Sequence, residues 1–277
     1  MKFLFAAIIL TSFLPYSFAE TLKTRIYSIE QSEESHLPHL VLLENGRVAT
    51  VDSSEKSSLT ELEKIRAKKY FIQLEVDRDN KLMSFALAPA SKESFYPDPE
   101  PVPQPNPSQY NPTNLASMEE ASAIFGRMDR RTQRNSQCYN RAHIWAYEEW
   151  QTSALNSVKL FMFFTKRYIW DYNYKWWFHV TPLTYVAGVP MTLDRTFMKK
   201  PTDVKTWTLN FIHSRRDCPV VQKYSQYSNN QETEHCYLIP APMYFWQPRD
   251  LDNFERTGAE KKSYVKQEIN HAYWEAF

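Results

Sequence analysis

Residues 137–143 read Gln-Cys-Tyr-Asn-Arg-Ala-His. A helix is predicted over Cys138–Ser153, with Ser136 or Asn135 as its N-cap. This start places the Cys138 sulfur in the first turn of the helix, where free backbone N–H groups and the helix dipole favour a thiolate. Because the thiolate is the nucleophilic form of cysteine, Cys138 is a candidate for covalent catalysis.

The chain holds three cysteines, an odd number. Cys218 and Cys236 lie in a polar, loop-like stretch and are predicted to form a disulfide in an oxidising compartment. Cys138 is then unpaired, and an unpaired cysteine in an exported protein invites unwanted disulfides, so its presence needs a reason. Catalysis is the favoured reason, and a buried small residue without chemical role is the alternative.

The first 19 residues are typical of a secretory signal peptide. Lys2 supplies the positive charge, Phe3–Phe13 a short apolar run, and Ser17–Ala19 a small-x-small cleavage site. A membrane span needs about 20 apolar residues, and neither this run nor any later segment provides them. The mature chain, without a membrane span, is therefore expected to be secreted or periplasmic; an uncleaved anchor is the alternative.

Charge and glycine content argue against several classes of partner. The sequence has 33 basic and 32 acidic side chains, which gives no support for nucleic acid or an anionic membrane as the partner. Four glycines against 17 prolines argue against a glycine-rich nucleotide-binding loop. Neither GxGxxG nor GxxxxGK[ST] occurs. No metal or organic cofactor is expected.

A proline-rich stretch divides the chain. Prolines at every second position from Pro97 to Pro107 alternate with polar or small residues. Proline fixes its own φ and favours extended geometry before it, so residues 91–113 are predicted to form a stiff linker. A proline-motif ligand for a partner is the alternative. Residues 20–90 are predicted to form a small α+β domain, and residues 114–277 a larger domain.

Short β-rich runs, turn signals and helix caps predict an α+β fold on both sides of the linker. Asn45-Gly46 predicts a hairpin turn within Glu44–Arg47, and Asp77–Asn80 a second one. Ser58 and Ser117 are the predicted helix caps, with Glu120 completing a capping box. Residues 214–258 are predicted to be irregular apart from an extended stretch at Tyr237–Trp246. The predicted strands are Arg25–Ile29, His39–Leu43, Val48–Val51, Phe71–Val76, Lys81–Leu87, Lys159–Phe164, Lys175–Val186 and Val189–Asp194, and the other predicted helices are Ser57–Tyr70, Ser117–Met128, Asp203–Ile212 and Ala259–Ala276.

His179 is the candidate base. It lies in the aromatic run Trp-Trp-Phe-His-Val at residues 176–180, where strand alternation sets it on one face with Trp177 and Thr181. His143 lies about 140° further round an ideal helix than Cys138 and does not share its face. A histidine among aromatic residues is equally compatible with a hydrogen-bonded core residue and with an active-site base.

Asp194 is the candidate for the group that orients His179. It follows the strand-like run 191–193, and an antiparallel hairpin with a turn near Gly188 would bring it beside His179. Taken alone, Asp194 is more simply a turn-forming aspartate. The order of a cysteine, a histidine on one strand and an aspartate on the next is more specific than any of its parts.

These three segments resemble the motif blocks of bacterial protein-glutamine glutaminases. Residues 138–143 (CYNRAH), 176–180 (WWFHV) and 193–197 (LDRTF) are similar in order and spacing to blocks written approximately C-Y-x-[RK]-A-H, W-x-[YF]-H-V and a hydrophobic pair followed by D-P-S-x-F. Trp207 resembles a tryptophan that follows the third block. Arg195 replaces the usual proline, and no similarity is recognisable after Ile212.

The resemblance implies a papain/transglutaminase-like core, with a cysteine-bearing helix packed on an antiparallel sheet. It implies that Cys138 is the nucleophile, that His179 is the general base and acid, and that Asp194 orients His179. The Cys138 backbone N–H, helped by Gln137, is the expected oxyanion donor. The implied reaction converts accessible glutamine side chains of proteins or peptides to glutamate and ammonia through a thioester.

The resemblance also implies that the N-terminal part regulates the enzyme. The family is made with a pro-region that blocks the active site until proteolysis, and residues 20–90 are similar to it in arrangement. Three alternatives remain open. The same triad could catalyse transglutaminase-like acyl transfer, it could cleave peptide or other amide bonds, or the chain could be a non-catalytic binding module.

Overall fold

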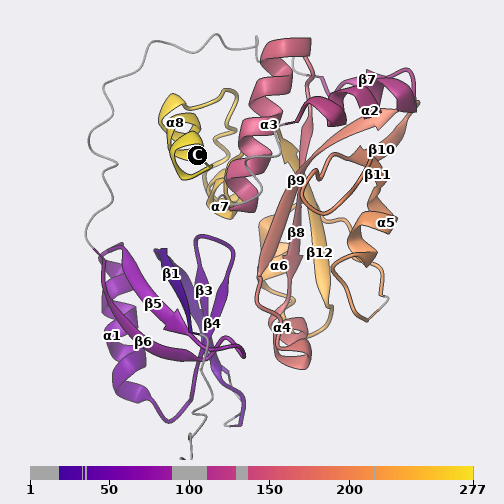
Figure 1. Ribbon diagram of the computed structural model, residues 1–277. Helices are drawn as coiled ribbons and strands as arrows, with labels where there is room; N and C mark the ends of the chain where they lie inside the picture. Colours follow the sequence, from indigo (N-terminus) through magenta and orange to yellow (C-terminus); the bar gives the residue numbers. More distant parts are fainter. Residues whose placement is uncertain are drawn as a thin grey trace, which may run out of the picture.

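The structure is a computed structural model that describes residues 19–32, 34, 36–88, 111–128, 137–214 and 216–276. Residues 1–18 of the predicted signal peptide, most of the predicted linker and the expected caps Ser136 and Asn135 lie outside the described residues. Figure 1 shows the elements before residue 89 gathered in one unit and those after residue 110 in a larger one. The predicted domain boundaries stay predictions.

Between residues 19 and 88, the described chain forms two antiparallel sheets and a helix. The elements are β1 (Glu20–Thr24), β2 (Ile26–Glu30), β3 (His39–Leu43), β4 (Val48–Val51), α1 (Lys56–Ala67), β5 (Ile72–Val76) and β6 (Leu82–Leu87). The strand orders are β1-β5-β6 and β2-β3-β4. Both sheets and α1 share one apolar core, in which Val41, Leu62 and Leu74 have no exposed surface. This arrangement confirms the small α+β unit.

One local prediction in this unit is wrong, and one strand was not predicted. α1 starts at Lys56 with Glu55 at the N-cap position. The predicted cap, Ser58, lies inside the helix and donates to the Glu55 carboxylate at 3.4 Å. β1 has no counterpart among the predicted strands, because Leu22 is its one strongly apolar residue and gives no alternating pattern.

The predicted hairpin turn at Glu44–Arg47 is confirmed. Gly46 has a φ of 87°, a conformation that residues with a Cβ rarely adopt. Asn45 Oδ1 accepts the Arg47 backbone N–H at 3.0 Å. The second predicted turn is also present, with Asn80 in the left-handed region at φ 63°.

The larger unit is built on an antiparallel sheet that carries the cysteine-bearing helix. Its elements are β7 (Asn114–Leu115), α2 (Met118–Arg127), α3 (Cys138–Ser153), β8 (Val158–Phe164), α4 (Lys166–Tyr172), β9 (Phe178–Val186), β10 (Val189–Thr192), β11 (Thr202–Asp203), α5 (Val204–Leu209), α6 (Tyr224–Ser228), β12 (Cys236–Pro242), α7 (Pro248–Thr257) and α8 (Lys266–Ala276). The strand order is β11-β10-β9-β8-β12, and β7 pairs with β9 in parallel. α3 packs against β9, and α8 packs against α3 (Figure 1). The predicted α+β class, with a helix packed on an antiparallel sheet, is confirmed.

The region after β11 departs most from prediction. α6 and α7 occupy part of residues 214–258, which are predicted to be irregular, and α8 begins at Lys266 instead of Ala259. α4 also has no predicted counterpart. Prolines and short element lengths weaken the periodic pattern in these segments, so packing against the sheet decides their structure.

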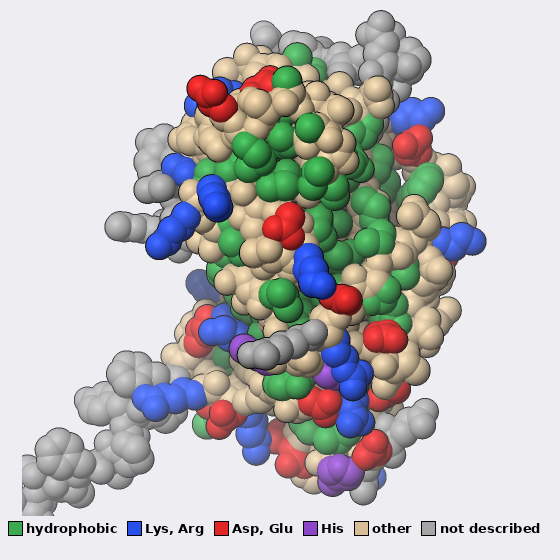
Figure 2. Space-filling view, turned by 90° about the vertical axis from the view of Figure 1, so that its right-hand side faces the viewer, with side chains coloured by type: hydrophobic (Ala, Val, Ile, Leu, Met, Phe, Trp, Pro, Cys, Tyr) green, Lys and Arg blue, Asp and Glu red, His purple; other side chains and the backbone are tan. Residues whose placement is uncertain are grey.

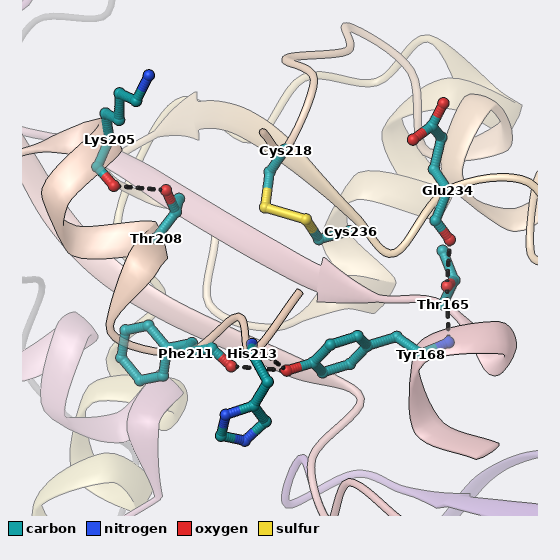
Figure 3. Close-up of a disulfide and its surroundings, with 9 residues drawn as sticks. All are labelled: Thr165, Tyr168, Lys205, Thr208, Phe211, His213, Cys218, Glu234 and Cys236. Carbon is teal, nitrogen blue, oxygen red and sulfur yellow. Dashed lines mark hydrogen bonds between the residues drawn. A yellow bond between two sulfur atoms is a disulfide. The ribbon is translucent and has the colours of Figure 1, made fainter. Parts of the chain in front are cut away.

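The predicted disulfide between Cys218 and Cys236 is present (Figure 3). It joins the segment before α6 to the first residue of β12. The same segment pairs with β12 through backbone hydrogen bonds of 2.8 Å from Val221 to Leu238 and 2.9 Å from Leu238 to Pro219. The disulfide therefore fixes this segment on the sheet.

Exposed hydrophobic side chains occur around β10 and α5. Val189, Phe197 and Leu209 are 52%, 46% and 45% exposed. Figure 2 shows the side of the molecule that carries α5, where hydrophobic side chains gather over the upper part and charged side chains are more frequent in the lower part. A surface of this kind is suited to contact with another polypeptide.

Candidate active site

Cys138 is the first residue of α3. Gln137 occupies the N-cap position with φ −72° and ψ 156°, and its side chain makes no capping hydrogen bond. The expected caps Ser136 and Asn135 lie outside the described residues, and Gln137 holds the N-cap position. The predicted position of Cys138 holds, since its sulfur lies in the first turn, unpaired and 2% exposed.

The fold brings Cys138, His179 and Asp194 together. His179 lies in β9, the strand on which α3 packs, and its Nε2 atom is 2.7 Å from Asp194 Oδ2. The His179 side chain is also within hydrogen-bonding contact of the Cys138 side chain. Because Nε2 faces Asp194, Nδ1 is the ring nitrogen left for the sulfur.

The β9–β10 hairpin places Asp194 beside His179. The two strands are antiparallel, with Thr192 opposite Leu183, and the turn uses Ala187 and Gly188 at φ 49° and 81°. The predicted turn near Gly188 is confirmed. Asp194 Oδ1 also accepts the Thr196 N–H at 3.3 Å, so the aspartate forms a turn as well as facing the histidine.

Trp207, from α5, completes the surroundings of Asp194. Its indole Nε1 donates to Asp194 Oδ2 at 2.9 Å. Arg195 stands where the family that the sequence resembles has proline. Its guanidinium lies 4.8 Å over the Phe125 ring of α2. The arginine at this position therefore connects the loop after β10 to α2, and Asp194 still contacts His179.

Charge and hydrogen bonding set the protonation of this group. Burial alone lowers the pKa of His179, but the Asp194 charge and hydrogen bonds to Asp194 and Cys138 outweigh it and raise the pKa to about 9. Burial alone raises the pKa of Asp194, but the charge and hydrogen bond of His179 and the Trp207 hydrogen bond hold it below its usual value. At neutral pH the two residues therefore form a buried imidazolium–carboxylate pair.

Aromatic rings enclose His179. Phe197, Phe211 and Trp207 have ring centroids 5.2, 4.7 and 5.7 Å from the imidazole. Trp207 and Phe211 are buried, whereas Phe197 is exposed to 46%. The rings fix the imidazole plane and exclude water from its buried side, while Phe197 forms a wall that an approaching molecule can touch.

Arg141 is a site residue that the sequence analysis does not single out. It is 7% exposed and lies three positions after Cys138, a helical spacing that puts both on one face. Burial lowers the pKa of Arg141, and the Cys138 and Asp194 groups oppose that shift. In the sequence, the three-residue spacing between Cys138 and Arg141 indicates that Arg141 lies on the same helix face as the nucleophile.

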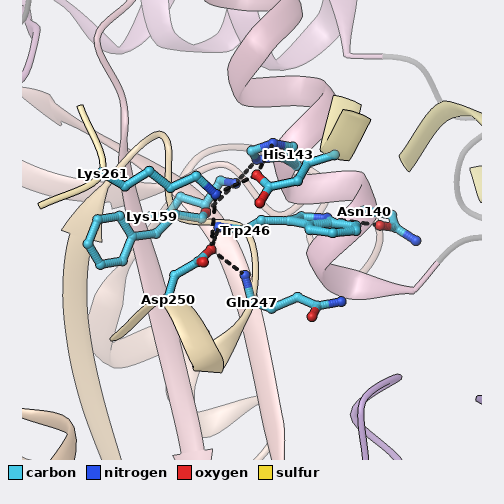
Figure 4. A network of polar contacts seen from close by, with 9 residues as sticks. Asn140, His143, Lys159, Trp246, Gln247, Asp250 and Lys261 are labelled. Atoms are coloured by element: carbon cyan, nitrogen blue, oxygen red, sulfur yellow. Dashed lines mark hydrogen bonds and ion pairs between the residues drawn. The ribbon is translucent and has the colours of Figure 1, made fainter. Parts of the chain in front are cut away.

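His143 lies away from the sulfur, as its helical position predicts. It is fully buried, and its Nδ1 atom is 2.6 Å from Lys159 Nζ, which also donates to the Phe245 carbonyl at 2.7 Å (Figure 4). No group of three or more His, Cys, Asp or Glu among the described residues could hold a metal ion. In the same part of the chain, no helix is long and apolar enough to cross a membrane.

The hairpin between β3 and β4 lies against the segment just before His179. Trp177 N donates to Gly46 O and Val48 N donates to Lys175 O, each at 3.0 Å. The Trp177 indole donates to Leu43 O at 2.7 Å. The two units are thus joined by backbone pairing within two residues of the candidate base.

A cavity of about 400 Å³ lies where the two units meet, beside the start of α3. Gln137 and Tyr139 line it from the helix, and Glu44 and Asn45 line it from the hairpin. Arg249 of α7 also lines it and is 3.6 Å from Glu44. Gln137, the residue before Cys138, therefore borders open space where the two units meet.

Residues 125–211, the segment that contains Cys138, His179 and Asp194, match a protein-family model described as Glutaminase. The match covers less than a third of the chain, and within it the chain is similar to a glutaminase family. Among solved structures it is similar to a crystal structure of pro-protein-glutaminase, with 11% identity, a TM-score of 0.46, and coverage of 89% of this chain and 87% of that chain. A mutant of pro-protein-glutaminase has 10% identity, a TM-score of 0.48, and coverage of 83% and 85%. No curated protein matches the chain.

Proposed function

We propose that this protein is an exported enzyme that deamidates glutamine side chains of polypeptides to glutamate and ammonia. One observation carries the proposal. The segment that matches the glutaminase family holds a cysteine at a helix start, in hydrogen-bonding contact with a histidine that is paired with a buried aspartate. We also propose that the core is related in fold to papain and to transglutaminases.

In the first step, the Cys138 sulfur attacks the side-chain carboxamide carbon of glutamine, and the thiol proton is carried by His179. Negative charge develops on the carboxamide oxygen. The backbone N–H of Cys138 lies at the start of α3, and Gln137 lines the adjoining cavity. These two groups are the proposed donors to the oxyanion.

In the second step, the carbon–nitrogen bond breaks and His179 gives its proton to the departing ammonia, which leaves a thioester on Cys138. A histidine with its pKa raised to about 9 holds the proton that this step requires. Neutral His179 then takes a proton from water, whose oxygen attacks the thioester carbon. Glutamate leaves, and the Cys138 thiol is restored.

Residues 20–90 are proposed to inhibit the enzyme in cis. Leu40, Leu42 and Val48 of this part share a hydrophobic cluster with Cys138 and Phe178. Cys138 is 2% exposed in this arrangement. Cleavage in the proline-rich stretch would release the hairpin and expose the segment before His179.

The substrate is proposed to be a protein or peptide with an accessible glutamine. The exposed Phe197 beside His179 and the exposed Leu209 of α5 support a polypeptide over a free amino acid. The Cys218–Cys236 disulfide is in keeping with the proposed export, because such bonds persist in oxidising compartments.

Ammonia release tests the proposal. The chain spanning residues 20–277 is compared before and after limited proteolysis within residues 91–113, with a blocked glutamine dipeptide and a denatured protein as substrates. We expect ammonia from the cleaved chain, little from the intact chain, and none from Cys138→Ala. Ammonia release by Cys138→Ala would exclude the thiol mechanism.

The same samples separate the alternatives. Covalent coupling of an added amine to a glutamine substrate, with no more ammonia released than amine coupled, would show acyl transfer. New peptide termini would show peptide-bond cleavage. If neither product nor ammonia forms and Cys138 reacts slowly with a thiol reagent after cleavage of the chain, the non-catalytic alternative is supported.

A further inference from the structure

Polar side chains of α8 contact α3 near both ends of α3. Near the end of α8, Glu275 accepts hydrogen bonds from Tyr139 Oη at 3.3 Å and from the Asn140 amide. Further back along α8, the Tyr273 hydroxyl donates to Glu148 Oε1 at 2.7 Å, near the opposite end of α3. The Glu275 contacts involve the turn that carries Cys138, whereas the Tyr273 contact does not.

Asn140 is held from both sides. It has no exposed surface, and its Oδ1 atom accepts the Trp246 indole N–H at 3.0 Å (Figure 4). Its amide donates to Glu275. With donor and acceptor both engaged, the carboxamide has one orientation. Because Asn140 is two residues from Cys138, fixing its side chain fixes the rotation of the first turn of α3 about the helix axis.

Glu275 is itself fixed by its neighbours. His271, one helical turn earlier, places Nε2 3.2 Å from Glu275 Oε1 and packs its ring 5.4 Å from Trp246. Tyr139 is buried between Trp246 and Phe178, with ring centroids 5.5 and 6.3 Å away. Burial and then the Glu275 charge raise the pKa of Tyr139, so its hydroxyl remains a donor to the carboxylate.

We propose that Glu275 is a positioning residue that sets the Cys138 sulfur against His179 through Asn140 and Tyr139. The proposal rests on the proposed function only in taking Cys138 as the nucleophile. A displacement of the sulfur by about 1 Å is enough to lower a rate ~100-fold, so a group that fixes the first turn controls the reaction without touching substrate. Glu275 lies outside residues 125–211, the segment matched by the glutaminase family.

Three variants of the full chain, cleaved within residues 91–113, test this role. Glu275→Ala removes the carboxylate oxygen that accepts both hydrogen bonds, and Glu275→Gln keeps an acceptor oxygen. Tyr273→Phe removes a hydrogen bond between the same two helices further along α3. Each is measured for kcat and KM in ammonia release, for melting temperature, and for the pH dependence of Cys138 alkylation by iodoacetamide.

We expect Glu275→Ala to lower kcat ~10- to 100-fold with KM changed by less than ~2-fold, and to alter the alkylation pH profile. Glu275→Gln should restore most of kcat. Tyr273→Phe should lower the melting temperature while kcat and the alkylation profile stay like wild type. A stability change alone therefore does not reproduce the result expected for Glu275.

Equal behaviour of Glu275→Ala and Tyr273→Phe in kcat and alkylation would overturn the proposal and leave Glu275 with a purely structural role. If Glu275→Ala does not fold, Tyr139→Phe removes one of the two contacts and should shift kcat and alkylation in the same direction. An unchanged Tyr139→Phe would then count against the proposal. If wild type releases no ammonia, the alkylation profiles still decide the role of Glu275 while the proposed function fails.

Discussion

Trp207 and His179 approach the same carboxylate oxygen of Asp194. The Trp207 indole nitrogen is 2.9 Å from Oδ2, and His179 Nε2 is 2.7 Å from it. Two donors on one oxygen fix the direction of the carboxylate, and the Trp207 ring also stacks on the imidazole at 5.7 Å. Trp207 therefore holds both members of the ion pair in one geometry.

Replacing Trp207 with phenylalanine should lower activity more than stability. The aromatic contact is largely kept, but Asp194 loses a hydrogen bond worth about 1–2 kcal/mol. We expect kcat for ammonia release to fall ~10-fold, because His179 is less firmly oriented. Trp170→Phe is the matched control, since its indole donates to Pro38 O at 3.1 Å away from the site. Equal kcat values for the two variants would contradict this role.

The His179–Asp194 pair predicts a loss of stability in alkali. The folded-state pKa of His179 is about 9, above its unfolded value of 6.5. Its contribution, on the order of 3 kcal/mol, is fully present below pH 6.5 and is lost as the pH rises through about 9. Urea unfolding between pH 6 and 10 should show this decline, and Asp194→Asn should remove most of it. Parallel curves for the two proteins would argue against a charged pair.

Buried His143 predicts that the stability of the fold also falls in acid. Burial, and then the charges of Lys159 and Lys261, hold the pKa of His143 well below its usual value of 6.5. The unfolded chain therefore binds a proton near pH 6.5 that the folded chain does not, so stability falls as the pH drops below that value. His143→Gln should flatten the stability curve between pH 6.5 and 5 relative to wild type. A wild-type slope that the substitution leaves unchanged would assign the loss to other groups.

The sequence predicts the elements that have a strong periodic pattern or a helix cap. α3 and β3 have the predicted bounds, and Ser117 caps α2 by accepting the Glu120 N–H at 3.2 Å. Alternation around His179 and the turn at Gly188 were enough to bring His179 and Asp194 together. Here the residues that matter are neighbours along one hairpin, so short-range patterns determine the contact.

Contacts between distant segments have no such signal. Glu275 meets Asn140 because α8 folds back on α3, and nothing in either segment encodes the other. α7 is different, because Pro248 at its first position and Gly258 after its end are the expected boundary residues. The bounds of α7 can therefore be predicted from the sequence, whereas the contact of Glu275 with α3 cannot.

Removing the disulfide should cost stability without removing the nucleophile. Cys218→Ser with Cys236→Ser frees the segment that carries α6, and a disulfide of this kind contributes about 2–4 kcal/mol. Cys138 lies in α3 and keeps its contact with His179, so alkylation of Cys138 should proceed at the wild-type rate at low temperature. Thermal melting and iodoacetamide labelling check the two statements separately. A loss of Cys138 labelling in folded protein would show that the disulfide also supports the site.

Gly46 tests whether the β3–β4 hairpin restrains the enzyme. Its φ of 87° is unfavourable for alanine, and an added Cβ would lie 3.3 Å from both the Phe178 and Trp176 rings. Gly46→Ala should therefore push the hairpin away from the segment before His179 and raise ammonia release by the uncleaved chain. Gly258→Ala is the matched control, because Gly258 has a φ of 68° with nothing within 4 Å of the added atom. After cleavage in the proline-rich stretch, both variants should approach wild-type activity. An uncleaved Gly46→Ala chain as inactive as Gly258→Ala would show that inhibition does not depend on this contact.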